Sequence, residues 1–414
     1  MRPRLRLDGH SYTPDLCRRL VRLAGQLSSA EQAAVALREA ADVAISGRQV
    51  QRLTREVGDD LVRQRDAQAV QHRRRQLVPR VQAAPPLAVV EVDGGRLGTR
   101  AAGAGPGVHQ PQAKEDKIAC LISMRSETAA EDPQPEPPPA FRDAPRVARL
   151  VRQLKAQAAP AAATEDAAPE ADTAAGVARA DPGAPAEVAS AGKPQRVLRT
   201  CVASMGNSRA FGPLVAAEAQ SRAFYDAPRQ AFVADGQQYN WSIQRAYFGH
   251  FEPIADFLHV MCYLYTAAWA VASDEAARWA QLEQWMTRCW QGQVAEVLGE
   301  LTLWQERLGR PPPGADAQDP RHVVAESVTY LSHNRSRMDY PRYRRQGMPV
   351  TSSLVESLVG EFNARVKSGQ KWWNRSAGAE AILQVRAAVL SEDDRLTRYF
   401  AERPGQPYRR RVCA

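Results

Sequence analysis

Two short apolar runs in this sequence each end on an aspartate that is followed by glycine. Residues 87–95 read LAVVEVDGG and residues 229–236 read RQAFVADG, so Asp93 and Asp235 occupy the same place in two similar patterns. A run of this kind predicts a buried strand whose last side chain reaches the edge of a sheet. A single strand-end Asp-Gly usually begins a turn, but the repetition favours a shared chemical role for the two acids.

A pair of strand-end carboxylates needs a counter-charge if the two strands are neighbours. Like charges raise the free energy of the ionised pair unless a cation lies between them, and Mg²⁺ or Mn²⁺ prefers such oxygen ligands. Two of these ions, about 3.5–4 Å apart, catalyse phosphoryl transfer. A third carboxylate, Glu356, is predicted on a helix within residues 347–373, which Thr351, Ser352 or Ser353 would cap. The expected metal ligands are therefore Asp93, Asp235 and Glu356.

Composition indicates a globular chain with a polyanionic partner. The 414 residues are enough for two or three domains, and a hydrophobic content of 44% is enough for a core. The net charge of +9 favours attraction to nucleic acid. No apolar run approaches about 20 residues and no signal peptide is apparent, so we expect a cytoplasmic, nucleoid-associated protein without a membrane partner. Six scattered cysteines without a CxxC pair suggest neither a zinc site nor a disulfide framework.

The first 80 residues hold a local excess of positive charge. Sixteen arginines and nine acidic residues give this segment a net charge of +7. Three predicted helices begin near Pro14, after Ser28-Ser29 and after Gly47, in a helix-turn-helix pattern. The helix after the glycine turn would enter the major groove of DNA. A small helical bundle with a solvated basic face is the alternative. The residues expected near DNA are Arg48, Gln49, Gln51, Arg52 and Arg55.

The Glu356 helix also carries residues that suit a phosphate backbone. Glu356, Asn363 and Lys367 lie within about a third of the helix circumference, because steps of seven and four residues nearly close on a 3.6-residue turn. Lys367 lies roughly 16 Å from Glu356 along the axis, too far to reach the same metal ions. We therefore assign Asn363, Arg365 and Lys367 to DNA binding. A solvated helix face is the alternative for these residues.

The order of predicted elements indicates an α/β fold. Strands are expected at 87–95, 117–124, 196–204, 229–236 and 251–256, with a helix before the fourth strand and another before the fifth. This order, with acids ending the first and fourth strands, matches the ribonuclease-H-like fold. The expected divisions are a helix-turn-helix domain at 1–80, a catalytic core at 85–259 and 346–400, a disordered Ala/Pro-rich insertion at 158–195, an all-helical insertion at 260–345 and a basic tail at 401–414.

Several stretches resemble a known family over most of residues 87–410. The segments VDGGRLGTR, KEDKIACLI, DPQPEPP, RTCVASM, FVADGQQYNW, ADFLHVMCYLY, MDYPRY and PVTSSLVESLVGEFNARVKS are similar to bacterial insertion-sequence transposases of the ISKra type, distant relatives of the Mutator group. The resemblance implies a DDE triad at Asp93, Asp235 and Glu356. It also implies a D-x-x-H signature, which Asp256 and His259 match, and a helical insertion between the second Asp and the Glu. The Ala/Pro-rich run departs from the family pattern, and Met1 is a candidate late start.

The expected function is therefore a transposase that cleaves and joins the ends of an insertion sequence with two Mg²⁺ or Mn²⁺ ions, as a homo-oligomer on DNA. Asp256 and His259 are assigned supporting roles at the edge of the acidic pocket, although a lone His on an apolar helix is often a core residue. Glu91, two residues before Asp93 on the same strand face, is a competing first ligand. A junction or repair nuclease and an inactive DNA-binding descendant remain open.

Overall fold

A computed structural model describes residues 12–99, 112–158, 193–366, 373 and 376–402. Most of the Ala/Pro-rich insertion predicted at 158–195 and nearly all of the basic tail predicted at 401–414 lie outside these ranges. Lys367 and all but the backbone of Glu356 lie outside them as well. None of the helices in the described ranges has the length and apolar character that crossing a membrane would require.

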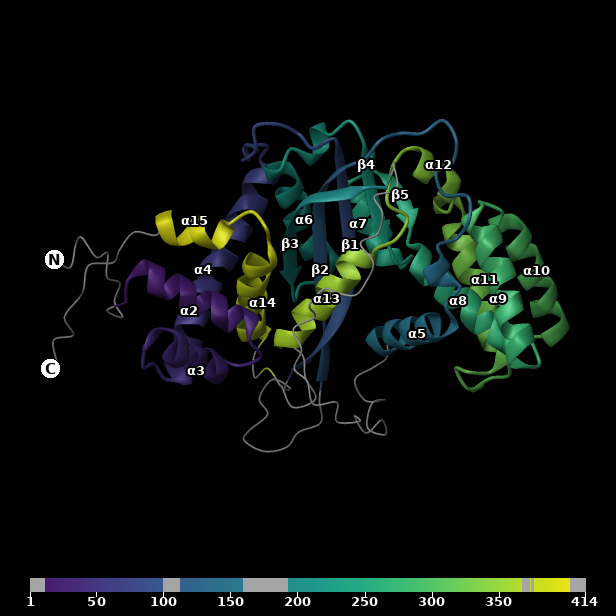
Figure 1. The fold of residues 1–414 in the computed structure, drawn as a ribbon, viewed down its shortest axis with the longest axis horizontal. Coiled ribbons are helices and arrows are strands. Elements are labelled where there is room, and N and C mark those ends of the chain that lie inside the picture. The colour runs from purple at the N-terminus through teal and green to yellow at the C-terminus, as the bar shows by residue number, and fades with distance from the viewer. Residues whose placement is uncertain (1–11, 100–111, 159–192, 367–372, 374–375, 403–414) are drawn as a thin grey trace.

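A five-stranded mixed sheet forms the centre of the molecule (Figure 1). The strand order is β3-β2-β1-β4-β5. The pairs β3–β2 and β2–β1 are antiparallel, and the pairs β1–β4 and β4–β5 are parallel. The expectation of an α/β chain with a mixed sheet is confirmed. The strands are β1 (Leu87–Thr99), β2 (Gln112–Arg125), β3 (Gln195–Ser204), β4 (Gln230–Ala234) and β5 (Glu252–Ala255).

Helices cover both faces of this sheet because its central strands are apolar on both sides. On β3, the Thr200 hydroxyl accepts a hydrogen bond from Arg222, which follows α6, whereas the neighbouring Arg199 side chain reaches the end of α14. Successive residues of a strand point to opposite faces, so α6 and α14 lie on opposite sides. The helices that flank the sheet are α5 (Ala144–Ala158), α6 (Ser208–Ser221), α7 (Gln238–Tyr247), α13 (Ser353–Val366), α14 (Ser376–Leu390) and α15 (Arg395–Glu402).

The N-terminal helices begin where the sequence predicts. Side chains of Thr13, Ser29 and Ser46 each accept a backbone N–H from the first turn of the helix that follows. The last helix packs directly against α14: a Cβ added at Gly58 would lie 2.4 Å from the Ala381 carbonyl oxygen. The N-terminal unit is therefore docked on the sheet-bearing part of the chain. Its helices are α2 (Pro14–Gln26), α3 (Ala30–Ala41) and α4 (Gly47–Arg73).

A second group of helices extends from the other side of the sheet, after β5 (Figure 1). Trp285 and Trp290 are fully buried in it. Its helices are α8 (Phe257–Val271), α9 (Glu275–Trp290), α10 (Val294–Leu308), α11 (Pro320–Asn334) and α12 (Tyr340–Arg345). Short 3₁₀ turns occupy Pro139–Phe141, Phe224–Asp226 and Arg335–Arg337. The helical segment predicted between Asp235 and Glu356 is thus present.

The turn after β4 requires glycine at position 236. Gly236 has φ +94°, and an added Cβ would lie 2.6 Å from a ring carbon of Tyr330 and 2.8 Å from Nδ2 of Asn334. We expect Gly236→Ala to lower the free energy of unfolding by about 2–4 kcal/mol, since it combines positive φ with overpacking.

Urea denaturation would measure this loss, with Gly299→Ala as the matched control. Gly299 lies inside α10 and an added Cβ would meet nothing within 4 Å. The control should be more stable by about 0.5–1 kcal/mol, because alanine has the higher helix propensity. Equal effects of the two substitutions would show that the turn does not need glycine.

Candidate functional site

Asp93 and Asp235 lie side by side at one edge of the sheet. Val92 of β1 pairs with Ala234 of β4 in parallel register, and each aspartate is the next residue along its chain. The parallel pairing stops at this point and β4 ends, so the two carboxylates meet there. The prediction that β1 ends near Asp93 is wrong, because the strand continues to Thr99 through its pairing with β2. Asp235 is 7% exposed and Asp93 is half-buried.

These two carboxylates open into a cavity of about 370 Å³. Its walls come from β1, β2, α5, α7, α8 and α11, so both the sheet and the helical insertion build it. His259 and Tyr263 contribute from α8, and Tyr239 from α7. The cavity is large enough for a group the size of one nucleotide unit and has acidic oxygens in one wall.

The charge of Asp93 is poorly compensated. Burial, and next the Asp235 carboxylate, raise the pKa of Asp93 from 3.8 to about 7. His259 and the Gly94 N–H, which donates to Oδ1 of Asp93 over 2.7 Å, act in the opposite direction. Asp235 is better supported, because its Oδ1 accepts from the Gln237 N–H at 2.9 Å and from Asn240 Nδ2 at 2.8 Å. Near neutral pH, Asp93 is therefore poised between its protonated and ionised forms.

The helical insertion fixes the turn that carries Asp235. Tyr330 of α11 donates its hydroxyl hydrogen bond to the Asp235 carbonyl oxygen over 3.0 Å. Asn334, one turn further along α11, donates to the Gly236 carbonyl oxygen at 3.4 Å and accepts from Trp241 Nε1 at 2.8 Å. The insertion therefore positions one acid of the pair through backbone and side-chain hydrogen bonds.

Asp256 joins the end of β5 to the start of the Glu356 helix. Its fully buried carboxylate accepts hydrogen bonds from the Leu258 N–H at 3.1 Å, the Ser352 N–H at 2.9 Å and the Ser352 hydroxyl at 2.8 Å. Burial alone would raise the pKa of Asp256, but His259 and Ser352 lower it below the ordinary value. An ionised carboxylate thus holds the residue that immediately precedes α13.

His259 combines a structural contact with a place in the cavity wall. Its Nδ1 lies 2.7 Å from Oδ2 of Asp256, and the side chain is 22% exposed. The imidazole also lowers the pKa of Asp93 through its charge. The D-x-x-H pair therefore lies beside the two aspartates, with Asp256 directed at α13 and His259 at the cavity.

Helix α13 carries Glu356, Asn363 and Arg365. The backbone of Glu356 lies in its first turn, and its side chain is outside the described part of the structure. Asn363 is half-buried, and its Oδ1 has no contact with solvent. Lys367 follows the last described residue of the helix.

The predicted contact of Arg365 with DNA phosphates does not hold in this structure. The side chain is 8% exposed, and Nε donates to the Ala24 carbonyl oxygen over 2.6 Å. The prediction treated Arg365 as open to solvent. Arg365 lies about 180° around the helix from Glu356, on a face that contacts the N-terminal unit, 341 residues away in the sequence.

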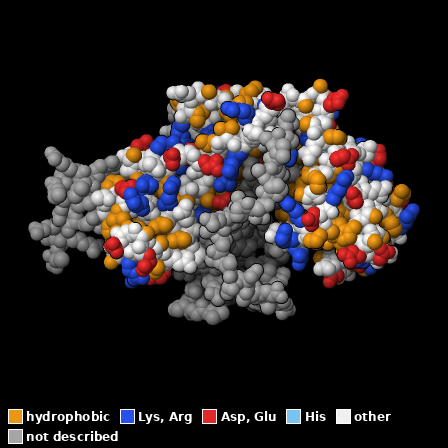
Figure 2. Space-filling view, viewed as in Figure 1, with side chains coloured by type: hydrophobic (Ala, Val, Ile, Leu, Met, Phe, Trp, Pro, Cys, Tyr) orange, Lys and Arg blue, Asp and Glu red, His pale blue; other side chains and the backbone are white. Residues whose placement is uncertain are grey.

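The basic residues predicted on α4 are accessible. Arg48, Arg52 and Arg55 are exposed and follow the spacing of one helix face. Gln51 is exposed beside them, and Gln49 is half-buried, with its backbone N–H bonded to the Ser46 hydroxyl. Arg55 lies 3.7 Å from Asp59, a surface ion pair that a phosphate could replace. On the face shown in Figure 2, acidic and basic side chains are interspersed.

Two residues of the site were missed from the sequence. Tyr239, four residues after Asp235, lies under the Lys117 ammonium at 3.9 Å from ring centroid to Nζ. Burial, then the carboxylates of Asp235 and Asp93, raise the pKa of Tyr239. Lys117 pairs with Gly94 across the β1–β2 ladder. The signal available in the sequence was the KEDK segment, in a strand predicted to pair with the Asp93 strand.

Glu91 does not compete with Asp93 for the cavity. It lies on β1 opposite Cys120 and has no exposed surface, whereas Asp93 lines the cavity. Its charge instead contributes, after burial, to raising the pKa of the Cys120 thiol. Of the two acids, Asp93 is therefore the one that faces the cavity.

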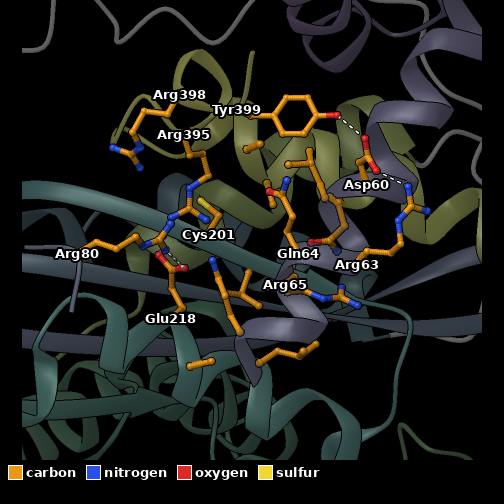
Figure 3. Close-up of a pocket in the computed structure, with 18 of the residues that line it drawn as sticks. Asp60, Arg63, Gln64, Arg65, Arg80, Cys201, Glu218, Arg395, Arg398 and Tyr399 are labelled. Atoms are coloured by element: carbon orange, nitrogen blue, oxygen red, sulfur yellow. Dashed lines mark hydrogen bonds and ion pairs between the residues drawn. The ribbon is translucent and has the colours of Figure 1, made fainter. Parts of the chain in front are cut away.

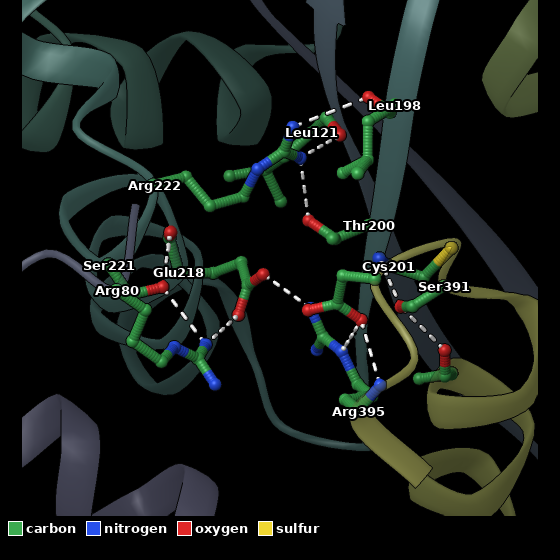
Figure 4. Close-up of polar contacts among 12 residues, drawn as sticks. Arg80, Leu121, Leu198, Thr200, Cys201, Glu218, Ser221, Arg222, Ser391 and Arg395 are labelled. Carbon is green, nitrogen blue, oxygen red and sulfur yellow. Dashed lines mark hydrogen bonds and ion pairs between the residues drawn. The ribbon is translucent and has the colours of Figure 1, made fainter. Parts of the chain in front are cut away.

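A larger cavity of about 1280 Å³ lies between α4, β3, α6, α14 and α15 (Figure 3). Its charged side chains are paired: Tyr399 donates to Asp60 at 2.7 Å, and Glu218 lies between Arg80 at 3.4 Å and Arg395 at 2.5 Å (Figure 4). The two guanidinium groups hold the pKa of buried Glu218 below its ordinary value despite its burial. These contacts hold α4, α15 and α6 together, so we assign them a structural role.

No protein-family model and no curated protein matches this chain. Within the described ranges, no three His, Cys, Asp or Glu side chains gather in a way that could hold a metal ion. Asp93 and Asp235 form a pair of oxygen donors, and a third donor from Glu356 would have to come from a side chain outside those ranges. The geometry and the chemistry of the two acids therefore carry the functional argument.

The raised pKa of Asp93 predicts a specific dependence of stability on pH. Because the folded-state pKa of about 7 is above the ordinary 3.8, ionisation costs folding free energy progressively as pH rises through this window, and the whole penalty applies above it. In metal-free buffer, Asp93→Asn should therefore have a higher Tm than the wild type at pH 8, and the difference should become smaller as the pH is lowered from 7 toward 4.

Thermal melts with and without Mg²⁺ would check this prediction. The ion should raise the Tm of the wild type at pH 8, and less so at pH 6, where a proton competes for Asp93. Asp93→Asn should show little response to Mg²⁺ at either pH. Parallel Tm profiles for the two proteins from pH 5 to 8 would show that Asp93 does not titrate in this window.

Proposed function

We propose that this chain is a DNA transposase with a ribonuclease-H-like core, which cleaves and joins the ends of an insertion sequence with an Asp93, Asp235 and Glu356 triad. The observation that carries the proposal is the pair of carboxylates side by side on adjacent parallel strands, with Asp93 within β1 and Asp235 directly after β4. The order of the sheet supports the fold assignment, since Asp93 lies on its first strand, Asp235 follows its fourth, and these strands are spatial neighbours.

The donor set fits a hard divalent cation. Asp93 and Asp235 offer oxygens, and the charge of Asp235 contributes, after burial, to the raised pKa of Asp93, an effect that a cation between the two would oppose. When bound, two Mg²⁺ or Mn²⁺ ions would activate the attacking water or 3′-hydroxyl and stabilise the leaving oxygen. Asp93, Asp235 and Glu356 are the residues that would hold them.

The other residues of the site prepare it for a phosphodiester. Asn240 and the Gln237 N–H fix the rotamer of Asp235, so its orientation does not have to be set when substrate arrives. Lys117, 4% exposed at its side chain, pairs with Glu115 of the cavity wall at 3.1 Å and lies over the ring of Tyr239. His259 lies at the rim, where it can orient a carboxylate or contact the DNA strand.

DNA recognition is assigned to a helix-turn-helix unit in the N-terminal helices. The exposed arginines of α4 supply phosphate or base contacts, and the preceding turn passes through Asp42, which has φ 52°. A nuclease specific for a DNA shape would share the acidic pair and would release products without joining them. The proposed enzyme acts in the cytoplasm on nucleoid DNA as a homo-oligomer assembled on element ends.

The triad is tested by isosteric substitutions. Asp93→Asn, Asp235→Asn and Glu356→Gln should each reduce strand cleavage at least about 1000-fold, because loss of a metal ligand removes the chemistry. Binding of the element ends should change little, since phosphate contacts lie elsewhere. Cleavage and joining of labelled oligonucleotides taken from the flanks of the gene would measure both steps.

Exposed Asp226 provides a control, because Asp226→Asn removes one acid away from the cavity. Its cleavage rate should equal that of the wild type. Wild-type cleavage by any triad variant would refute the assignment of that residue. Cleavage without joined products in the wild type would favour the nuclease.

The basic face of α4 is tested by salt dependence. Replacing Arg48 or Arg52 with alanine should weaken DNA binding and reduce the slope of log K against log salt by about one counterion each. Fluorescence anisotropy at several salt concentrations would give the slopes. An unchanged slope in both variants would mean that this face is solvated and does not contact DNA. Arg22→Ala, on the exposed side of α2, serves as the charge-matched control.

A further inference from the structure

Two buried arginines converge on the last turn of α2. Arg365 of α13 donates from Nε to the Ala24 carbonyl oxygen at 2.6 Å and from Nη1 to the Ser28 carbonyl oxygen at 3.4 Å. Arg386 of α14 donates from Nη1 to the Gly25 carbonyl oxygen at 2.7 Å. The last carbonyl groups of a helix have no partner within it and carry partial negative charge, so cations suit this end.

The same arginines join α13 to α14. Arg386 donates from Nε and Nη2 to the Glu361 carbonyl oxygen, at 3.2 and 2.6 Å. Gly25 brings the α2 backbone close to α14, since an added Cβ would lie 2.9 Å from Cγ2 of Val389. The second half of α13 is therefore fixed to α2 both directly and through α14.

Burying two arginines side by side has a cost in folding free energy that packing alone does not require. Burial, and next the charge of Arg386, lower the pKa of Arg365 to about 10, so two like charges share a site with little water. Apolar side chains of similar volume often replace buried charges without loss of stability. Guanidinium groups, however, fix direction, because each holds particular carbonyl oxygens at hydrogen-bond distance.

The first residue before α13 is fixed independently by the catalytic core, through the hydrogen bonds from Ser352 to Asp256. Glu356 lies between these two attachments, four residues after Ser352 and nine before Arg365. The helix that carries the third carboxylate is thus held at one end by the sheet and at the other by the N-terminal unit.

We infer that Arg365 and Arg386 are positioning residues through which α2 sets the placement of the Glu356 helix. The N-terminal unit then serves metal binding at the catalytic acids as well as DNA binding. This inference rests on the proposed function, because it takes Glu356 to be a metal ligand. DNA bound by the N-terminal helices would act on the metal site through the same contacts.

The test is a Mg²⁺ titration of Arg365→Met and Arg386→Met, followed by thermal shift and by cleavage rate. Each variant should need about tenfold more Mg²⁺ for half of the maximal Tm increase, the usual scale for a lost supporting contact. At the wild-type Mg²⁺ concentration kcat should fall while KM for DNA stays constant. Arg365→Lys, which keeps one donor, should restore part of the Mg²⁺ response, and exposed Arg22→Met should behave as wild type.

Two outcomes would overturn the inference. A variant with a lower metal-free Tm but a wild-type Mg²⁺ midpoint and kcat would show that the arginines only stabilise the fold. If the methionine variants do not fold, Arg365→Lys and Gly25→Ala are tested instead. Wild-type Mg²⁺ midpoints in both of these variants would contradict the inference. Glu356→Gln distinguishes failure of this inference from failure of the proposed function. If this variant keeps the wild-type Mg²⁺ response and cleavage rate, the proposed function fails as well.

Discussion

The burial of the Asp93 and Asp235 carboxylates side by side is the constraint on which the surrounding structure depends. The parallel pairing of β1 with β4 brings the two acids together, and burial, followed by the Asp235 charge, raises the pKa of Asp93. Glu218, by contrast, is buried between Arg80 and Arg395, which lower its pKa. The contrast marks the Asp93 and Asp235 pair as a candidate functional site, because strongly shifted pKa values concentrate at such sites.

The surrounding elements hold this unfavourable pair in place. The turn after Asp235 is held by α11 through Tyr330, and the start of α13 is held by Asp256. Both attachments use hydrogen bonds that are almost or fully buried, so the strain of the acidic edge is opposed by contacts that water does not weaken. The helical insertion is therefore part of the scaffold of the site, even though it lies outside the sheet.

Local sequence patterns predicted much of this fold. The strand end before Asp235 and the caps at Thr13, Ser29 and Ser46 depend on neighbouring residues, which a sequence displays directly. The end of β1 was predicted too early, because its continuation to Thr99 depends on pairing with β2. The role of Arg365 could not be predicted, because its hydrogen-bond acceptors on α2 are 337 and 341 residues away. Tyr239 and Lys117 were missed for a related reason: their contact needs the β1–β2 register and the α7 orientation together.

The docking of the N-terminal helices on α14 has a consequence for biosynthesis. The apolar side chains of Val50, Leu53 and Val57 on α4 are buried, and their helix packs on a segment near residue 381. A ribosome makes that segment long after α4 has emerged, and exposed apolar surface on a nascent chain favours aggregation or chaperone binding. The N-terminal helices therefore cannot complete their packing until the C-terminal helices have been synthesised. A chain that stops before them lacks both the packing partner of α4 and the helix that bears Glu356.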